Sequence, residues 1–268
     1  MDDLHSRLIP RQPHRWWAWL VVSQLLVAWL WWRFGWAVGL PCMMVSHLAF
    51  WWGALMPRST LYSPCLARLP TRERVVWLTI DDGPSAETPA VLDLLDAHGA
   101  KATFFVVGER AAAHPELICE IVRRGHGIGN HSDTHPAGTF WALGPTRMRN
   151  EITRCQDTLR SITGVAPIWF RAVVGMANPF VTAPLRDLGL ARVAWTARGY
   201  DGVAGDVAKV VARIERDLAP GTIVLLHEGA GHGHNIDILH EVLKRLDVLG
   251  YRAALPDQTA AITLDGAR

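Results

Sequence analysis

The chain has 268 residues, half of them hydrophobic, and a formal net charge of +2. This length allows one α/β domain with a small additional segment. The basic residues are mostly arginines scattered along the chain without a long run, so no nucleic-acid partner is expected. The four cysteines, Cys42, Cys65, Cys119 and Cys155, have neither CxxC spacing nor the density of a disulfide framework, which predicts free thiols.

The first quarter of the chain is apolar and rich in tryptophan. Nine of the thirteen tryptophans lie between positions 16 and 52, and residues 16–32 and 34–56 contain no charged side chain. As helices these segments would be roughly 25 and 35 Å long, against a hydrocarbon core of about 30 Å. We therefore predict a two-helix membrane anchor over residues 16–56, in contact with membrane lipid. The alternative is a hydrophobic hairpin packed on a soluble domain.

Arginines flank both ends of this predicted anchor. Arg7, Arg11 and Arg15 precede it and four arginines between positions 58 and 74 follow it, whereas the turn holds only Arg33. The positive-inside rule then places the large domain on the cytoplasmic side of the cell (inner) membrane. The predicted organisation is a basic N-terminal tail (1–15), the anchor (16–56), a proline-containing linker (57–74), the large domain (75–256) and a C-terminal tail (257–268).

Strands and helices alternate in the large domain. The predicted strands cover residues 75–80, 103–107, 126–130, 168–171, 191–195, 222–226 and 252–255. The predicted helices cover residues 89–98, 115–124, 146–163, 179–188, 206–218 and 236–249. This alternation predicts a parallel α/β architecture, either open or closed. No GxGxxG or Walker-type loop follows a strand, so a nucleotide cofactor has no support.

Two adjacent aspartates, Asp81 and Asp82, end the first apolar strand. Residues that leave a strand in succession point in different directions, so one carboxylate can bind a metal while the other accepts a proton. The alternative is a solvated Asp-Gly-Pro turn.

Further titratable residues follow other strands. His131 and His135, four residues apart in NHSDTHP, would present both imidazoles to one side, and two histidines with one carboxylate are typical of a catalytic metal site. Either histidine alone could equally be a core or surface residue. Arg171 and His227 also end strands, and His227 is a candidate acid. The glycine-rich loop 227–234 indicates a mobile, solvated segment rather than a second metal site.

These motifs together resemble the polysaccharide deacetylase family, carbohydrate esterase family 4, known by its NodB homology domain. The similarity covers residues 74–255, and its specific parts are TIDDGP and NHSDTHP at this separation. The resemblance implies a distorted (β/α) barrel of about seven strands, preceded here by the predicted transmembrane hairpin. It also implies a divalent metal ion, commonly Zn²⁺, at the carboxyl ends of the strands.

The resemblance also implies roles for individual residues. Asp82, His131 and His135 would bind the metal, and Asp81 would be the base that takes a proton from metal-activated water. His227 would be the acid that protonates the leaving amine.

Three further positions correspond less directly to the family pattern. Arg171 resembles the arginine that orients the base, and Asp201 the aspartate that keeps the acid cationic. A backbone N–H near Val174 would help to hold the oxyanion.

The sequence departs from the family where substrate is recognised. The family's Arg-x-Pro-aromatic is replaced by Arg171-Ala-Val-Val, and its fourth motif by WTARGYD, which adds Arg198. We therefore expect an N-acylated carbohydrate or a lipid-linked amino sugar as substrate rather than a long chitin-like chain. The alternatives are an inactive membrane-anchored glycan-binding scaffold and a phosphodiesterase on the same barrel.

Overall fold

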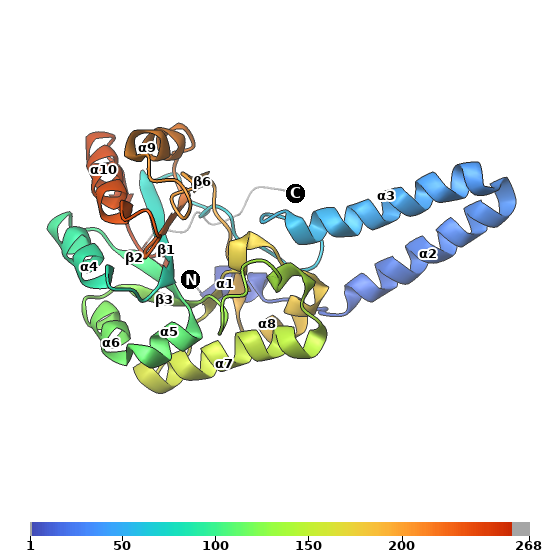
Figure 1. The fold of residues 1–268 in the computed structure, drawn as a ribbon, viewed down its shortest axis with the longest axis horizontal. Helices are drawn as coiled ribbons and strands as arrows, with labels where there is room; N and C mark the ends of the chain where they lie inside the picture. Colours follow the sequence, from blue (N-terminus) through green and yellow to red (C-terminus); the bar gives the residue numbers. More distant parts are fainter. Residues whose placement is uncertain (1, 259–268) are drawn as a thin grey trace.

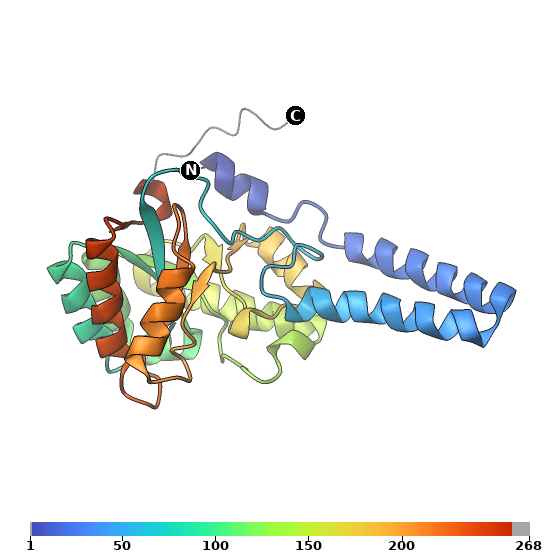
Figure 2. The same cartoon turned by 90° about the horizontal axis from the view of Figure 1, so that it is seen from above.

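The computed structural model describes residues 2–258 and shows a curled parallel half-barrel with a helical hairpin projecting from one side (Figures 1 and 2). Seven strands follow the order β5–β4–β3–β2–β1–β7–β6, and β8 pairs with the first residues of β1. All paired strands are parallel. The strands are β1 Val75–Gly83, β2 Ala102–Val106, β3 Gly127–Asn130, β4 Trp169–Phe170, β5 Ala191–Arg192, β6 Ala197–Arg198, β7 Ile223–His227 and β8 Arg252–Ala253.

Helices that connect the strands lie around the sheet (Figure 1). They are α4 Thr88–Ala97, α5 Gly108–Ala113, α6 Pro115–Arg123, α7 Pro145–Thr163, α8 Thr182–Asp187, α9 Val207–Arg216 and α10 Asn235–Val248. Short 3₁₀ segments occur at Phe140–Ala142, Val173–Gly175, Pro179–Val181 and Pro256–Gln258. The expected parallel α/β architecture is therefore confirmed, in the form of a curled half-barrel.

The strand β1 is central to the core because apolar side chains cover both of its faces. Val76, Leu78 and Ile80 belong to the cluster that packs against the helices. On the other face, Trp77 is fully buried in the inner cluster and donates a hydrogen bond from Nε1 to Oγ1 of Thr103 at 2.9 Å. This two-sided burial explains why the strand is an unbroken apolar run rather than an alternating one.

The edge strands are shorter than the sequence pattern predicts. The strands expected at residues 168–171 and 191–195 are reduced to two residues each, and β6 and α5 were not expected. A two-residue strand has too few positions to show an alternation of apolar and polar side chains. Strand β6 is defined instead by its pairing with β7.

The segment 57–74 packs against the barrel, which differs from the expectation of a linker. Leu66 and Leu69 are buried in the inner cluster. The N–H of Leu66 donates to the carbonyl of Arg192 at 2.9 Å, and the N–H of Ala194 donates to the carbonyl of Leu66 at 2.8 Å. Strands β5 and β6 do not pair with each other. The segment therefore supplies hydrogen-bond partners for backbone groups at Arg192 and Ala194 that would otherwise have none.

The N-terminal residues also dock on the barrel, where a basic tail was expected. Helix α1 (Asp2–Leu8) places Leu4 and Leu8 against the inner cluster. The ring of His5 meets Trp169 edge-on at 5.4 Å between centroids, and its Nε2 lies 3.1 Å from the carbonyl oxygen of Ile168. The predicted C-terminal tail lies outside the described residues from position 259 onward.

The hairpin consists of α2 (Arg15–Phe34) and α3 (Trp36–Leu55), joined at Gly35 with a φ of 77°. Inside it, the side chain of Gln24 donates to the hydroxyl of Ser46 at 2.9 Å. Most of its large apolar side chains point outward and are exposed. Among the described helices, α3 alone is long and apolar enough to cross a membrane by length and hydropathy, so the spanning character of α2 is not established.

Candidate metal centre and catalytic site

The strand β1 ends in a bulge at the two aspartates. Asp81 pairs with Phe105 and Gly83 pairs with Val106, so Asp82 is the extra residue. Asp82 has a φ of 71°, in the left-handed region. In a regular strand adjacent side chains point to opposite faces, and because the bulge interrupts this alternation, both carboxylates reach Nε2 of His131, at 3.6 Å from Asp81 and 3.4 Å from Asp82.

Asp82, His131 and His135 form a cluster whose ligand atoms all lie within 4.8 Å of one another. Oδ1 of Asp82 lies 2.9 Å from Nε2 of His135 and 3.4 Å from Nε2 of His131. This oxygen is buried and makes no hydrogen bond of acceptable geometry. Burial raises the pKa of the Asp82 carboxyl, but the two imidazoles outweigh burial and lower it. An ionised, unpartnered oxygen beside two imidazoles fits a divalent metal ion.

The first histidine is oriented by its backbone neighbours. Nδ1 of the buried His131 lies 2.9 Å from the carbonyl oxygen of Arg171. If Nδ1 donates this bond, Nε2 is left free for a metal. The preceding Asn130 is also fixed, because its amide donates to the carbonyl of Ile152 at 2.9 Å and its side-chain oxygen accepts from the N–H of Ser132 at 3.0 Å.

A buried glutamate holds the loop between the two histidines. Glu151, on α7, accepts hydrogen bonds from the N–H groups of Asp133 and Thr134 at 3.2 and 2.9 Å, and from the Thr134 hydroxyl at 2.7 Å. His135 is anchored through its N–H, which donates to the Ser132 hydroxyl at 3.2 Å. Sequence reasoning missed Glu151, although a glutamate on the buried stripe of α7 was a usable signal.

Asp81 lies between a buried arginine and the metal cluster. Nη1 of Arg171 donates to Oδ1 of Asp81 at 2.6 Å and to the Thr79 hydroxyl at 2.8 Å. The guanidinium also lies 4.1 Å from the ring centroid of Phe105. Burial lowers the pKa of Arg171, and Asp81 opposes that effect. The other oxygen of Asp81 lies 3.6 Å from Nε2 of His131. The arginine thus fixes one oxygen and leaves the second facing the cluster.

His227 and Asp201 form the second charged pair of the site. Nδ1 of His227 lies 3.0 Å from Oδ1 of Asp201, and the His227 N–H donates to Oδ2 at 2.6 Å. Burial opposes a charge on the imidazole, but the fully buried Asp201 outweighs burial and raises the pKa of His227 to about 9. His227 pairs with Asp81 across β7 and β1, so a protonated imidazole lies on the strand next to the candidate base.

The raised pKa of His227 predicts the alkaline limit of activity. Because the imidazole is protonated below about pH 9, kcat/KM should fall as the pH rises through that value. In Asp201→Asn the largest cause of the increase is removed while Asp81 and Asp82 still raise the pKa of His227, so the alkaline limb should move down by at least about one pH unit. The pH profile of kcat/KM for the metal-loaded protein measures this shift. An unmoved limb in Asp201→Asn contradicts the pairing.

A second buried carboxylate, Glu228, supports the end of β1. It accepts hydrogen bonds from the hydroxyls of Ser85 and Thr88 at 2.8 and 2.5 Å. Burial raises its pKa to about 7, against the effect of these two bonds. A Cβ at position 83 would lie 2.1 Å from Oε1 of Glu228, so a larger residue there would displace this carboxylate. No sequence pattern distinguished Glu228, as a buried residue, from the solvated residues of the loop that follows it.

The segment after Arg171 carries small apolar side chains. Arg171 is followed by buried Ala172 and Val173, and then by Val174, which is 39% exposed and has a φ of 54°. In the histidine-rich loop, Nε2 of His232 lies 2.5 Å from the backbone carbonyl oxygen of Asp201. The structure therefore brings the seven candidate site residues together at one edge of the sheet, whereas it leaves the turn at Val174 without an aromatic side chain.

A parallel half-barrel with three imidazoles, two adjacent aspartates and an arginine near its strand ends provides a site suited to a divalent metal, as hydrolases that activate water require. The sequence profile of the polysaccharide deacetylase family matches residues 68–193. The chain is 39% identical over 158 residues to a chitooligosaccharide deacetylase of Bradyrhizobium sp. (strain ANU 289), covering 58% of this chain and 71% of that protein. It is 31% identical over 189 residues to a peptidoglycan-N-acetylglucosamine deacetylase of Bacillus cereus, covering 68% and 67%.

Solved structures show the same fold. A family 4 carbohydrate esterase from Streptomyces lividans in complex with acetate superposes with a TM-score of 0.63 and 30% identity, covering 71% of this chain and 98% of that one. A family 4 pseudoenzyme from Bacillus anthracis has a TM-score of 0.63 and 26% identity, covering 70% and 66%. The chain belongs to the polysaccharide deacetylase family, whose enzymes are hydrolases of carbon–nitrogen bonds other than peptide bonds.

Proposed function

We propose that this protein is a membrane-anchored, metal-dependent deacetylase that removes the N-acetyl group from an amino sugar in a glycan or a lipid-linked saccharide. The observation that carries this proposal is the convergence of Asp81, His227 and the cluster at Asp82 on adjacent strand ends. The relatives from Bradyrhizobium and Bacillus cereus are named as deacetylases of N-acetylated glycans, which supports the same bond type here.

The residues divide the reaction between them. Asp82, His131 and His135 would hold the metal, for which Zn²⁺ suits the donor set. The metal, when bound, lowers the pKa of water and polarises the acyl carbonyl. Asp81, held by Arg171, takes the proton of the attacking water.

His227 acts as the acid at the carbon–nitrogen bond. As the carbon–nitrogen bond cleaves, His227 gives its proton to the leaving amine, and acetate and a free amino sugar result. Asp201 keeps His227 protonated before this step, and the backbone near Val174 would contact the developing oxyanion.

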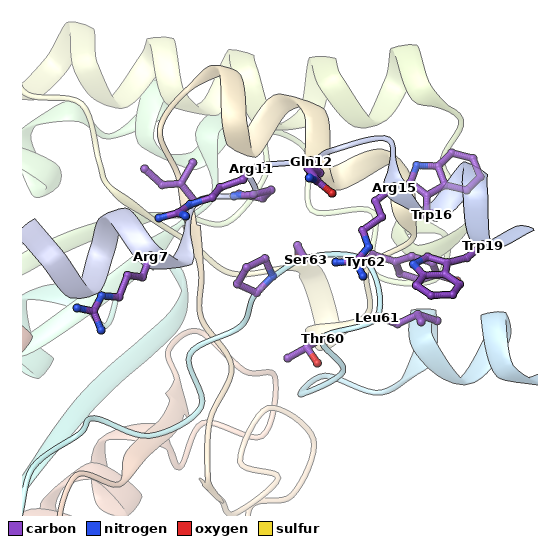
Figure 3. A pocket seen from close by; sticks show the side chains of 13 residues that line it. Arg7, Arg11, Gln12, Arg15, Trp16, Trp19, Thr60, Leu61, Tyr62 and Ser63 are labelled. Atoms are coloured by element: carbon purple, nitrogen blue, oxygen red, sulfur yellow. The ribbon is translucent and has the colours of Figure 1, made fainter. Parts of the chain in front are cut away.

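The hairpin supports attachment to a membrane. Its exposed apolar faces would be buried by lipid, and the length of α3 is sufficient to span the hydrocarbon core. Figure 3 shows the base of the hairpin, where Arg11, Arg15 and Trp19 surround a cavity of about 720 Å³ opposite the loop with Tyr62. Arginines and tryptophans at this level match the chemistry of lipid headgroups. By the positive-inside rule, the domain would face the cytoplasm.

A non-catalytic scaffold is the second candidate, since the relative from Bacillus anthracis is a pseudoenzyme. Asp81 and His227 argue against it here. A protein that only binds glycans needs neither a carboxylate held by a buried arginine nor an imidazole whose pKa is raised to about 9.

Acetate release tests the proposal. The full chain, solubilised from membranes and loaded with Zn²⁺, should release acetate and an equal amount of free amine from chitooligosaccharides or lipid-linked N-acetylated amino sugars, and a chelator should abolish this release. The protein should also remain with the membranes after alkaline carbonate extraction. Hydrolysis of phosphodiesters without acetate release from any N-acetylated sugar contradicts the deacetylase function.

A further inference from the structure

A cavity of about 500 Å³ lies between the end of the hairpin and the edge of the barrel. The hairpin side and the segment after it contribute an indole, a thioether and a guanidinium, and the barrel side contributes two aromatic rings and a second guanidinium, beside the ion pair of Arg216 with Asp217. These side chains are Trp52, Met56 and Arg58 on one wall and Trp195, Arg198 and Tyr200 on the other.

Two of the three guanidinium groups that line this cavity have no carboxylate partner among the described residues. Within residues 2–258, neither Arg58 nor Arg198 forms an ion pair, whereas Arg216, also in the wall, is paired with Asp217 at 3.2 Å. Nε of Arg198 is buried and makes no hydrogen bond. Its guanidinium lies 4.4 and 5.2 Å from the ring centroids of Tyr200 and Trp195, which hold it in place. A positioned arginine with an unpaired N–H is suited to an anionic ligand.

The cavity is close to the catalytic groups. The ring of Trp195 that contacts Arg198 also contacts Arg171, at 5.8 Å, and Arg171 holds Asp81. Tyr200 directly precedes Asp201, the partner of His227. One indole ring therefore separates the cavity from the arginine of the catalytic site.

The opposite wall is the end of the proposed membrane anchor. Trp52 and Met56 are 58% and 43% exposed, so an apolar surface borders the two arginines on the hairpin side. A ligand that fills this cavity would have an apolar part towards the hairpin and an anionic part at the arginines.

We propose that this cavity binds the phosphate ester that joins the amino sugar to a lipid, with Arg58 and Arg198 as its ligands. This proposal rests on the proposed deacetylase function and names the substrate class of the same site. A phosphate is favoured over a carboxylate of the glycan because the arginines border the hairpin, where a lipid phosphate would leave the bilayer. The first carbons of the lipid chain would contact Trp52 and Met56.

The test compares two probes that differ only in the phosphate. They are a short isoprenyl phosphate ester of N-acetylglucosamine and the uncharged isoprenyl glycoside of the same sugar. With the full Zn²⁺-loaded protein, kcat/KM for acetate release should favour the phosphate probe by about ten- to a hundredfold, and Arg198→Gln should reduce this ratio several-fold, since Arg58 remains in place. Arg149→Gln removes the same charge from a surface arginine paired with Asp187 and should keep the wild-type ratio.

Calorimetric binding of the phosphate probe separates this proposal from the deacetylase function. Binding should weaken in Arg198→Gln by a similar factor and persist in Arg149→Gln. Equal binding to wild type and Arg198→Gln, or an equal loss of kcat/KM with both probes, overturns the phosphate site. If no N-acetylated sugar is hydrolysed but binding still depends on Arg198, the deacetylase function fails and the phosphate site stands.

Discussion

Replacement of Asp82 by alanine is expected to abolish metal binding and to lower kcat/KM by at least about a thousandfold. The reason is that the variant removes the only carboxylate of the three-residue cluster found among the described residues. The chemistry attributed to the metal corresponds to several kcal/mol of transition-state stabilisation. The measurements are metal content after dialysis and the rate of acetate release.

The matched control is Asp93→Ala, which removes an exposed aspartate of α4 that pairs with Arg124 at 2.7 Å. This variant should keep its metal and its activity. His131→Ala should reproduce the loss seen in Asp82→Ala, since both residues belong to the same cluster. Full metal content and full activity in Asp82→Ala and His131→Ala would refute the site.

Replacement of Asp81 by asparagine should leave the metal in place but lower kcat by about 10²- to 10⁴-fold, because a general base contributes that much. The folded state should also lose roughly 3–5 kcal/mol, since the variant leaves the buried guanidinium of Arg171 without its carboxylate. Metal content, kcat and the denaturant midpoint measure the three effects.

A double variant separates catalysis from stability. Asp81→Asn combined with Arg171→Gln removes both buried charges, so it should recover much of the lost stability without recovering kcat. Recovery of kcat in the double variant, or wild-type kcat in Asp81→Asn, would show that the base is a different residue.

The altered wall near Val174 agrees with the cavity beside Arg198. The family's aromatic groove residue is replaced by valine, while an arginine is added in the segment that follows Trp195. The two changes reduce stacking with a long glycan and add a charge on the hairpin side of the site. Both changes agree with the proposed lipid-linked substrate.

The residues that end the strands were identifiable from the sequence because a strand and the polar residues that follow it are neighbours in the chain. An apolar run predicts a buried strand, and the first polar residues after it lie at its carboxyl end. Since parallel strands bring their carboxyl ends to one edge, Asp81, His131, Arg171 and His227 could be expected to meet. The roles of these residues stay predictions until the variants are measured.

Other features depended on contacts between distant segments. The bulge at Asp82 arises from pairing with β2, and the packing of residues 57–74 arises from the gap between β5 and β6. Asp201 was uncertain from its motif, and only the fold shows its carboxylate bonded to His227. The same is true of Glu151 and of the unpaired Nε of Arg198.

The sequence by itself determined the order of strands and helices, the family, and which kinds of side chain stand at the strand ends. Each of these depends on residues close together in the chain and on the strands being parallel. Only the tertiary structure decided which atoms of those side chains face one another. It also decided that the hairpin ends beside the catalytic edge. These relations are set by long-range packing and backbone pairing, which no short stretch of the chain encodes.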